Sequence, residues 1–415
     1  MAHVSHVWRC QRNLKVKLSS RNLVFITLCG LVLFLSLGQR HSMGLYLIPV
    51  TSNLSWGRET FSFAIALQNL IWGAAQPFAG MLADRIGARR VMVIGGVFYA
   101  AGLLLMPYST TGLLFSITVG LLVGLGLSGT GFGIVYGAVG KALRPEQRPA
   151  GLGLVGAIGG VGQLLVLPLN LTLIDTLGWT TAVLLVSVVV AAIIPLALGT
   201  AKEEPAPLAS DGMNMSQTLS NAFRDRDFWL LTVGFLACGF QLAFIGTHMP
   251  AYLADNGLQP SVATTALGLI ALTNIVGTYL FGVWGGRWQR KTLTVWLYLG
   301  RVLAILLFLW MPVTPVSVYL FAALMGFLWL GTVPLTNGMI GQIFGIRYVS
   351  TLFGFVFLSH QIGSFLGVWL GGWMYDTYKS YTWVWILAAA LSLLSAVLHA
   401  PIRERRPATA ARAVA

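Results

Sequence analysis

The stretch GMLADRIGARR, Gly80 to Arg90, places one carboxylate and three arginines between two long apolar segments. A related stretch, GVWGGRWQRK, runs from Gly282 to Lys291 and lies 202 residues later. Short basic loops between apolar segments are typical of the cytoplasmic side of membrane proteins, where Lys and Arg are in excess. The two copies therefore predict a membrane protein built from a duplicated unit.

The composition supports this interpretation. The chain has 415 residues, of which 56% are hydrophobic and only 9% are charged, and its mean hydropathy is +0.78. A soluble protein would carry about 25% charged residues. The N-terminal residues are basic and polar, without the apolar core and small-residue cleavage site of a signal peptide. We expect a polytopic protein that is embedded in a lipid bilayer.

Twelve segments have the length that a membrane span requires, about 20 predominantly apolar residues. They are residues 23–50, 58–82, 91–108, 112–141, 149–174, 179–200, 228–254, 262–286, 293–311, 315–345, 350–374 and 381–401. We predict an all-α polytopic membrane protein with 12 transmembrane helices in two pseudo-symmetric six-helix bundles. The polar segment SQTLSNAFRDRDFW, which lies between the sixth and seventh spans, is expected to form a short surface helix before the seventh span.

The duplication sets the predicted domain boundaries. Pro49 and Pro250, Tyr136 and Asn337, and Gly162 and Gly363 all stand 201 residues apart. Parallel repeats of this kind place a substrate site at the interface of the halves. The predicted parts are a cytoplasmic tail (1–22), a first bundle (23–200), a cytoplasmic linker (201–227), a second bundle (228–401) and a second cytoplasmic tail (402–415).

The net charge of +14 reflects membrane topology and does not indicate nucleic-acid binding. Only Arg58 and Lys379 fall in one set of alternating loops, and Arg40 and Arg301 fall inside apolar segments. The other basic residues lie in the opposite set of loops and in the two tails. This asymmetry predicts that both termini are cytoplasmic, in a multi-pass protein of the cell (inner) membrane. The three cysteines offer no disulfide framework.

The Gly80–Arg90 stretch resembles the loop between helices two and three of the major facilitator superfamily. Gly80, Asp84, Arg85, Gly87, Arg89 and Arg90 meet the family pattern at every position. The resemblance implies the twelve-helix fold of that family, and it implies that Asp84 closes the cytoplasmic gate against the start of helix eleven, near Val349 to Leu352. The alternative is that the loop only sets topology. Gly286 stands at the position of Asp84 in the second copy.

A second resemblance concerns helices four and five. The segment GLGLSGTGFGIVYGAVGKALRPEQRPAGLGLVGAIGGVGQLLVLPL is similar to the corresponding helices of monocarboxylate transporters and oxalate–formate antiporters of bacterial type. SNLSWGRETFSFAIA resembles the first external loop and second helix of their bacterial relatives. The Asp and Arg that monocarboxylate transporters carry in helix eight are missing from ALGLIALTNIVGTYLFGVWG, so a substrate-binding cation must come from elsewhere.

Arg40, in LFLSLGQRHSMGLYLIPV, is the candidate cation. A charge at the centre of a membrane helix costs about 2.5–3.5 kcal/mol, so it usually has a partner or a function. The planar guanidinium is suited to binding a carboxylate through two parallel hydrogen bonds. The alternatives are a structural bond to a backbone carbonyl, or snorkelling over roughly 15 Å to the outer end of the helix. Gln241 is the equivalent of Arg40 in the second half.

No acidic residue is expected within the membrane to neutralise Arg40. The twelve Asp and Glu residues all lie in loops, tails or at helix ends: Glu59, Asp84, Glu146, Asp175, Glu203, Glu204, Asp211, Asp225, Asp227, Asp255, Asp376 and Glu404. A buried charge without a partner is destabilising, so the natural counter-ion is the substrate itself. We therefore expect a small-molecule anionic substrate.

Other polar residues are assigned by their place in the predicted helices. Tyr136, Asn337, Gln241, Gln163, Asn274 and Gln68 are expected to orient the substrate, although such residues also join helices structurally. His41 and His360 are the candidates for carrying protons, since the ordinary pKa of His is near 6.5. Arg301 lies in helix nine, which is peripheral in the family fold, and is expected to snorkel toward the cytoplasm.

These observations predict a secondary transporter that moves a small organic anion, most simply a monocarboxylate, with protons by alternating access. Anion exchange is one alternative. Transport of an uncharged vitamin- or drug-like compound, with Arg40 structural, is another. A receptor or a scaffold without transport is a third, but the short tails contain no sensor domain. No metal-ligand spacing, Walker loop or nucleophile constellation occurs, so we expect no cofactor and no enzymatic activity, and we expect a monomer.

Overall fold

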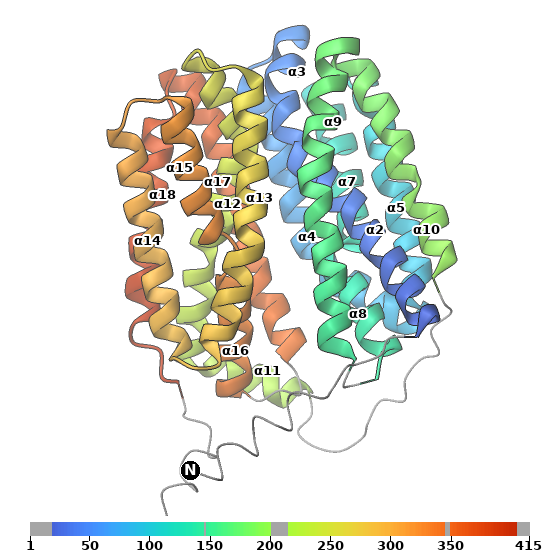
Figure 1. Ribbon diagram of the computed structural model, residues 1–415, viewed down its shortest axis with the longest axis vertical. Coiled ribbons are helices and arrows are strands. Elements are labelled where there is room, and N and C mark those ends of the chain that lie inside the picture. Colours follow the sequence, from blue (N-terminus) through green and yellow to red (C-terminus); the bar gives the residue numbers. More distant parts are fainter. Residues whose placement is uncertain (1–18, 145–146, 201–214, 345–348, 405–415) are drawn as a thin grey trace, which may run out of the picture.

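The computed structural model describes residues 19–144, 147–200, 215–344 and 349–404, and within these ranges the secondary structure is entirely helical. The first half of the chain contains α2 (Ser20–Ser42), η1 (Met43–Tyr46), α3 (Leu47–Leu54), α4 (Arg58–Ile86), α5 (Ala88–Leu105), η2 (Met106–Tyr108), α6 (Gly112–Phe115), the π-helix η3 (Ser116–Leu122), α7 (Val123–Thr130), α8 (Phe132–Ala142), α9 (Arg148–Ala191) and α10 (Ile193–Gly199). Figure 1 shows these helices on one side of the molecule.

The second half forms the other side. It contains α11 (Met215–Arg224), α12 (Arg226–Asp255), α13 (Pro260–Gly285), α14 (Arg290–Trp310), α15 (Pro315–Phe327), α16 (Thr332–Phe344), α17 (Val349–Tyr378) and α18 (Thr382–His399). The predicted short surface helix is confirmed as α11, whose Phe223 packs against Phe228 and Phe355 with ring centroids 5.5 and 5.1 Å away. Helix α3 lies at the opposite end of the molecule from α11, and we call that end the predicted outer end (Figure 1).

The predicted spans correspond to helices. Ten helical segments of the described chain are long and apolar enough to cross a membrane. One of them, residues 151–199, holds two spans, because Gly178 (φ 78°, ψ 158°) interrupts the helix and the chain turns back (Figure 1). Helix α4 is not among the ten, but it is 29 residues long and lies beside them. These twelve spans form the predicted architecture.

The fourth and tenth spans are each interrupted, whereas the sequence predicts continuous helices there. In the first half Gly131 is extended (φ −82°, ψ −176°) between α7 and α8. In the second half residues 328–331 separate α15 from α16. Gly131 corresponds to Thr332 at the repeat offset of 201, so the two interruptions occupy equivalent places. Backbone groups that an interruption frees inside a membrane must find other partners.

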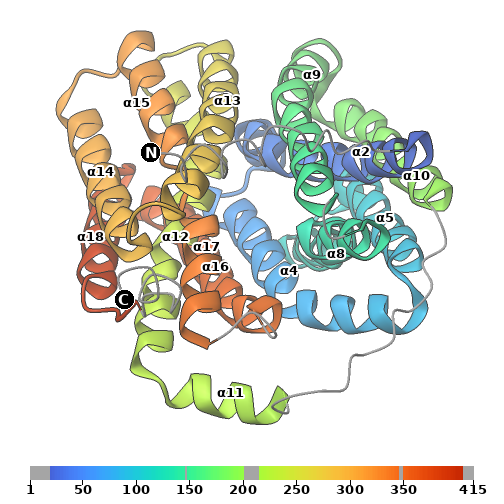
Figure 2. The ribbon, with the colours of Figure 1, turned by 60° about the horizontal axis from the view of Figure 1, so that its bottom comes forward.

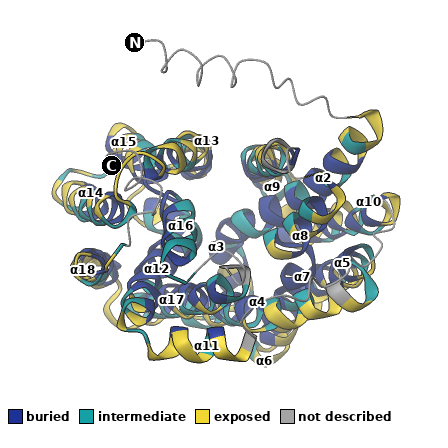
Figure 3. Cartoon of the chain, turned by 90° about the horizontal axis from the view of Figure 1, so that it is seen from below, coloured by how far each residue is buried: buried dark blue, intermediate teal, exposed yellow. Residues whose placement is uncertain are grey.

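The two halves contact each other through the interior of the molecule (Figure 2). Helix α4 packs along α17, and α9 packs along α13. Within the halves, α2 packs on α9 and α12 packs on α17, at distances that only glycine allows. A Cβ atom on Gly162 would collide with the backbone of Phe34, and one on Gly239 would collide with that of His360. Exposed residues gather on peripheral helices and on α11 (Figure 3).

Candidate functional site

Arg40 lies near the end of α2, and its side chain is half-buried. Its Nη2 donates a hydrogen bond of 2.8 Å to Oδ1 of Asn69 on α4, and its Cζ lies 5.0 Å from the centroid of the Trp72 ring. Among the side chains that the structure describes, the single ion pair joins Arg58 to Asp255. Within that set, Arg40 therefore has an amide and an aromatic ring as neighbours but no carboxylate partner.

The Asn69 amide links Arg40 to the second half of the molecule. Its Nδ2 donates to the carbonyl of Ile65 over 2.9 Å, which leaves Oδ1 turned toward Arg40. The backbone carbonyl of Asn69 accepts a 3.1 Å hydrogen bond from Nε2 of Gln361 on α17. Oε1 of Gln361 lies 3.1 Å from Nδ1 of His360. We call Arg40, Asn69, Gln361 and His360 the Arg40 chain; it crosses the interface of the two halves.

Aromatic rings lie along one side of the Arg40 chain. Trp72 meets Phe357 edge to face with centroids 5.6 Å apart, and Phe357 stacks on the His360 ring at 5.6 Å and an angle of 11°. Nε1 of Trp72 donates to Gln76, whose Nε2 donates to the carbonyl of Ser128 beside the interruption at Gly131. Sequence reasoning did not single out Trp72, because an aromatic residue in an apolar helix carries no distinctive signal.

The structure brings one of the two candidate proton carriers to the Arg40 chain. His360 is buried and is a member of the chain. His41, although it follows Arg40 directly, turns back along α2, where its Nδ1 lies 2.9 Å from the carbonyl of Leu37. Neighbouring helical residues point about 100° apart, which explains why the two do not share a direction.

The other predicted substrate residues are distributed over both halves. Tyr136, on α8, is half-buried; its ring packs on Phe132, and its hydroxyl lies beside Gly156 of α9. Asn337, on α16, is half-buried and donates to the carbonyl of Val333 in its own helix over 3.3 Å. Gln68 and Gln163 are buried, and Oε1 of Gln68 has no hydrogen-bond partner among the residues that the structure describes. No described contact joins these side chains to Arg40.

Gln241 and Asn274 lie beside the interruption between α15 and α16 and make hydrogen bonds within the second half, and their role in orienting a substrate stays a prediction. Oε1 of Gln241 accepts from Arg301 over 3.0 Å, and its Nε2 donates to the carbonyl of Ala388 and to Ser392. Oδ1 of Asn274 accepts from the backbone N–H of Leu330 over 3.0 Å. These three amide atoms have partners inside the second half, and no described contact joins either residue to Arg40.

Arg301 does not snorkel, contrary to expectation. Its side chain is fully buried (0% exposed), and its Nε and Nη2 donate to the carbonyl of Leu328 over 3.1 and 2.7 Å. Nη2 also donates to the carbonyl of Trp329 and contacts Sγ of Cys238 at 3.6 Å. The guanidinium thus bonds the carbonyls that the end of α15 leaves free, a position that favours a cation.

The predicted inner gate lies at the loop between α4 and α5. Gly87 adopts φ 92°, a conformation that favours glycine, and it ends α4 and begins α5. Nη1 of Arg90 donates to the carbonyl of Ile86 over 3.4 Å. A Cβ atom on Gly80 would meet open space, and Arg85 is exposed while Arg89 is half-buried. The side chain of Asp84 lies outside the described part of the structure, so its role remains a prediction.

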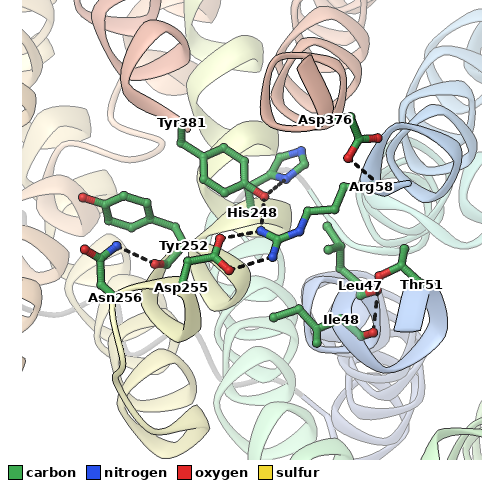
Figure 4. A network of polar contacts seen from close by, with 10 residues as sticks. All are labelled: Leu47, Ile48, Thr51, Arg58, His248, Tyr252, Asp255, Asn256, Asp376 and Tyr381. Carbon is green, nitrogen blue, oxygen red and sulfur yellow. Dashed lines mark hydrogen bonds and ion pairs between the residues drawn. The ribbon is translucent and has the colours of Figure 1, made fainter. Parts of the chain in front are cut away.

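A second group of contacts crosses between the halves at the predicted outer end. Arg58, the first residue of α4, bonds the carboxylate of Asp255 at the end of α12, and Asp376 of α17 approaches the backbone of Arg58 (Figure 4). Sequence reasoning assigned no function to these residues, because three different helices, α4, α12 and α17, bring them together.

Comparisons with known proteins agree with this architecture. The family model described as Major Facilitator Superfamily matches residues 28–342. An uncharacterized MFS-type transporter of Bacillus subtilis, YcxA, is 23% identical over 87% of this chain and 90% of its own. Human monocarboxylate transporter 11 is 25% identical over 90% of this chain and 81% of its own. The oxalate:formate antiporter of Oxalobacter formigenes is 24% identical over 84% of this chain and 83% of its own.

Proposed function

The chain belongs to the major facilitator superfamily, a family of multi-pass membrane transporters, and from this premise we propose that it carries a small organic anion, most simply a monocarboxylate. The proposed mode is proton-coupled uptake across the cytoplasmic membrane by alternating access, with both termini in the cytoplasm. Exchange of two anions fits the same site.

The observation that carries the proposal is the environment of Arg40. The guanidinium is half-buried among membrane helices, and its described partners are the neutral amide of Asn69 and the ring of Trp72. Neither removes its charge, and a cation in a low-dielectric surrounding attracts an anion strongly. Its remaining N–H donors suit a carboxylate, which can accept two of them in parallel. The substrate would thus supply the negative charge that the described helices around Arg40 lack.

Two of the relatives point to the same class of cargo. Their names state that they are a monocarboxylate transporter and an oxalate:formate antiporter, and oxalate and formate are small carboxylates. The identities of 24 and 25% are low, so the names support the cargo class without identifying the substrate.

The remaining roles follow from position. Tyr136 and Asn337, with Gln163 and Gln68, are the polar side chains that would orient the anion. They lie on α8, α16, α9 and α4. His360 is the better candidate for a proton carrier because it belongs to the Arg40 chain, whereas His41 is bonded within its own helix. Asp84, with Gly80, Arg85, Gly87, Arg89 and Arg90, would close the inner gate.

One observation favours a second candidate function. The bond from Arg40 to Asn69 and the ring of Trp72 would also suit a purely structural arginine that ties α2 to α4. In that case the cargo would be an uncharged compound, such as a vitamin or a drug.

Uptake by proteoliposomes separates the two candidates. A panel of labelled carboxylates is supplied to the parent protein, to Arg40→Gln and to a control, Arg224→Gln, which removes an exposed positive charge from α11. Loss of two charge-assisted hydrogen bonds should lower carboxylate uptake at least about 100-fold in Arg40→Gln, which corresponds to about 2.7 kcal/mol. The control should keep the parent rate. Equal uptake by Arg40→Gln and the parent would remove Arg40 from the site.

A further inference from the structure

The first turn of α4 is capped by a carboxylate from the other half of the molecule. Oδ1 of Asp376 accepts a 3.0 Å hydrogen bond from the backbone N–H of Arg58, and Oδ2 accepts one of 2.7 Å from the N–H of Glu59. A helix leaves its first N–H groups without internal partners, and its positive end favours a negative charge. Gly57, the residue before the helix, offers no side-chain cap, and a Cβ atom there would collide with Asp376.

The side chain of Arg58 strengthens the same junction (Figure 4). Its Nη1 and Nη2 bind the two oxygens of Asp255 at 2.6 and 2.7 Å, and Nη1 also donates to the hydroxyl of Tyr381 over 2.9 Å. Its Cζ lies 3.6 Å from the centroid of the Tyr375 ring. Arg58 is only 13% exposed in its side chain, so this two-pronged ion pair is better shielded than an ordinary surface pair.

Buried groups hold the second-half side of the junction in place. The hydroxyl of Tyr381 lies 3.2 Å from Nδ1 of His248, and Nε2 of His248 lies 2.8 Å from the carbonyl of Val368. His248 is fully buried. Nε1 of Trp369 donates to Glu59 over 3.1 Å, which adds a further bond between α17 and α4. The partners of α4 therefore come from α12, α17 and the start of α18.

We infer that Asp376, together with the Arg58–Asp255 pair, forms an outer gate, in which one half of the transporter caps a helix of the other half. This inference rests on the transport activity of the family and not on the anionic cargo proposed above. When the halves separate at the predicted outer end, the N–H groups of Arg58 and Glu59 lose the Asp376 carboxylate. The cap thus stabilises only the state in which that end is closed.

The pairing of α4 with α17 gives the gate its place in the cycle. Asp376 lies near the end of α17 and caps the start of α4. The proposed inner gate uses the reverse arrangement, with Asp84 near the end of α4 and the start of α17 as its partner. Rocking of the halves would therefore exchange one cap for the other, so that the two ends are not open together.

Accessibility of one engineered cysteine tests the outer gate without a measurement of uptake. Thr51, on α3, lies beside this junction (Figure 4) and is 7% exposed. Among the described contacts, its hydroxyl bonds only carbonyls of its own turn, so Thr51→Cys is a conservative substitution that introduces a reporter thiol. A membrane-impermeant maleimide is applied from outside to cells carrying Thr51→Cys, with and without Asp376→Asn. Asparagine keeps one acceptor oxygen, but its NH2 group cannot accept the second N–H and the negative charge at the helix start is lost. The labelling rate should therefore rise about tenfold, which corresponds to about 1.4 kcal/mol in the closed-to-open equilibrium.

The repeat provides a matched control. Asp175 stands 201 residues before Asp376, at the equivalent helix end of the first half, and is exposed. Asp175→Asn should leave the labelling of the reporter unchanged, and the chain with Thr51 intact reports the background from Cys10, Cys29 and Cys238. Asp255→Asn removes the ion pair with Arg58, and it should also raise the labelling rate. This variant replaces Asp376→Asn if the latter does not reach the membrane.

Unchanged labelling in both Asp376→Asn and Asp255→Asn would overturn the gate, as would an equal acceleration in Asp175→Asn. Neither result would bear on the cargo, because the assay compares the labelling of variants and does not measure uptake. Conversely, full carboxylate uptake by Arg40→Gln would remove the proposed cargo site and leave the gate intact.

Discussion

The two arginines within the membrane spans, Arg40 in the first half and Arg301 in the second, have opposite environments. Arg301 is fully buried. Its guanidinium donates hydrogen bonds to the carbonyls of Leu328 and Trp329, to Gln241 and to the thiol of Cys238. Arg40 is half-buried and has one described hydrogen bond, to Asn69. Arg301 therefore satisfies backbone carbonyls, whereas most N–H donors of Arg40 have no described partner.

Under the proposed function, this difference separates a structural arginine from a substrate-binding one inside the membrane. Arg301 lies where an interrupted helix leaves carbonyls free, and these dipoles compensate its charge without any acid. The equivalent interruption at Gly131 has a neutral partner, because Gln76 bonds the carbonyl of Ser128. The interrupted helix of the first half thus has no described bond to Arg40, and under the proposed function the remaining donors of Arg40 bind the substrate.

The largest effect on stability is expected for Arg301→Gln. Its removal would leave the carbonyls of Leu328 and Trp329 and the amide of Gln241 without their partner in a buried setting. Each buried acceptor that loses its partner costs about 1–3 kcal/mol. Thermal unfolding in detergent should show a large drop in Tm for Arg301→Gln, whereas Arg40→Gln should stay close to the parent. A similar Tm for both variants would contradict the claim that Arg301 is structural and Arg40 is not.

A smaller effect on transport is expected for Arg40→Lys. Lysine keeps the positive charge but lacks the planar fork that binds both oxygens of a carboxylate. Carboxylate uptake should fall about tenfold below the parent, corresponding to about 1.4 kcal/mol, and should exceed that of Arg40→Gln. Kinetics of uptake over a range of substrate concentrations measure this order. If lysine proved no better than glutamine, charge would not be what Arg40 contributes.

The smallest effect is expected for Cys238→Ser. The thiol contacts Arg301 at 3.6 Å and Thr332 at 3.3 Å, but Arg301 retains its carbonyl partners without it. A serine hydroxyl can make the same bonds, so the free energy of unfolding should change by no more than about 1 kcal/mol. A comparison of the Tm of Cys238→Ser with that of Arg301→Gln would show whether the carbonyls or the thiol hold the guanidinium. A loss as large as that of Arg301→Gln would assign this task to Cys238.

Much of the fold could be predicted because the controlling signals are local. Apolar length sets the spans, basic loops indicate the topology, and the 201-residue offset reveals the duplication. The interruption of the tenth span was missed although Gly331 and Pro334 lie beside it, since glycine and proline are common in membrane helices. Without that interruption, Arg301 has no visible partner in the sequence, and the hydrogen bonds of Gln241 and Asn274 beside it cannot be foreseen.

The candidate site was predictable only in part, for a related reason. The position of Arg40 and the scarcity of acids could be read from the sequence, because both depend on composition within single helices. The partners of Arg40 could not be chosen in this way, since Asn69 was one of several polar residues on its helix. The outer gate depends on Arg58, Asp255 and Asp376, which lie far apart in the chain and meet only after the halves pack together.

The central claim is that the cargo supplies the negative charge for Arg40, and Asn69→Asp tests it most directly. The substitution is nearly isosteric and would place a carboxylate where the amide oxygen now lies 2.8 Å from Nη2 of Arg40. The account predicts that carboxylate uptake by proteoliposomes falls about 100-fold in Asn69→Asp, because the new carboxylate already neutralises Arg40. Asn69→Ala, which removes the same bond without adding a charge, should stay within about tenfold of the parent. Parent-like uptake by Asn69→Asp would contradict the claim.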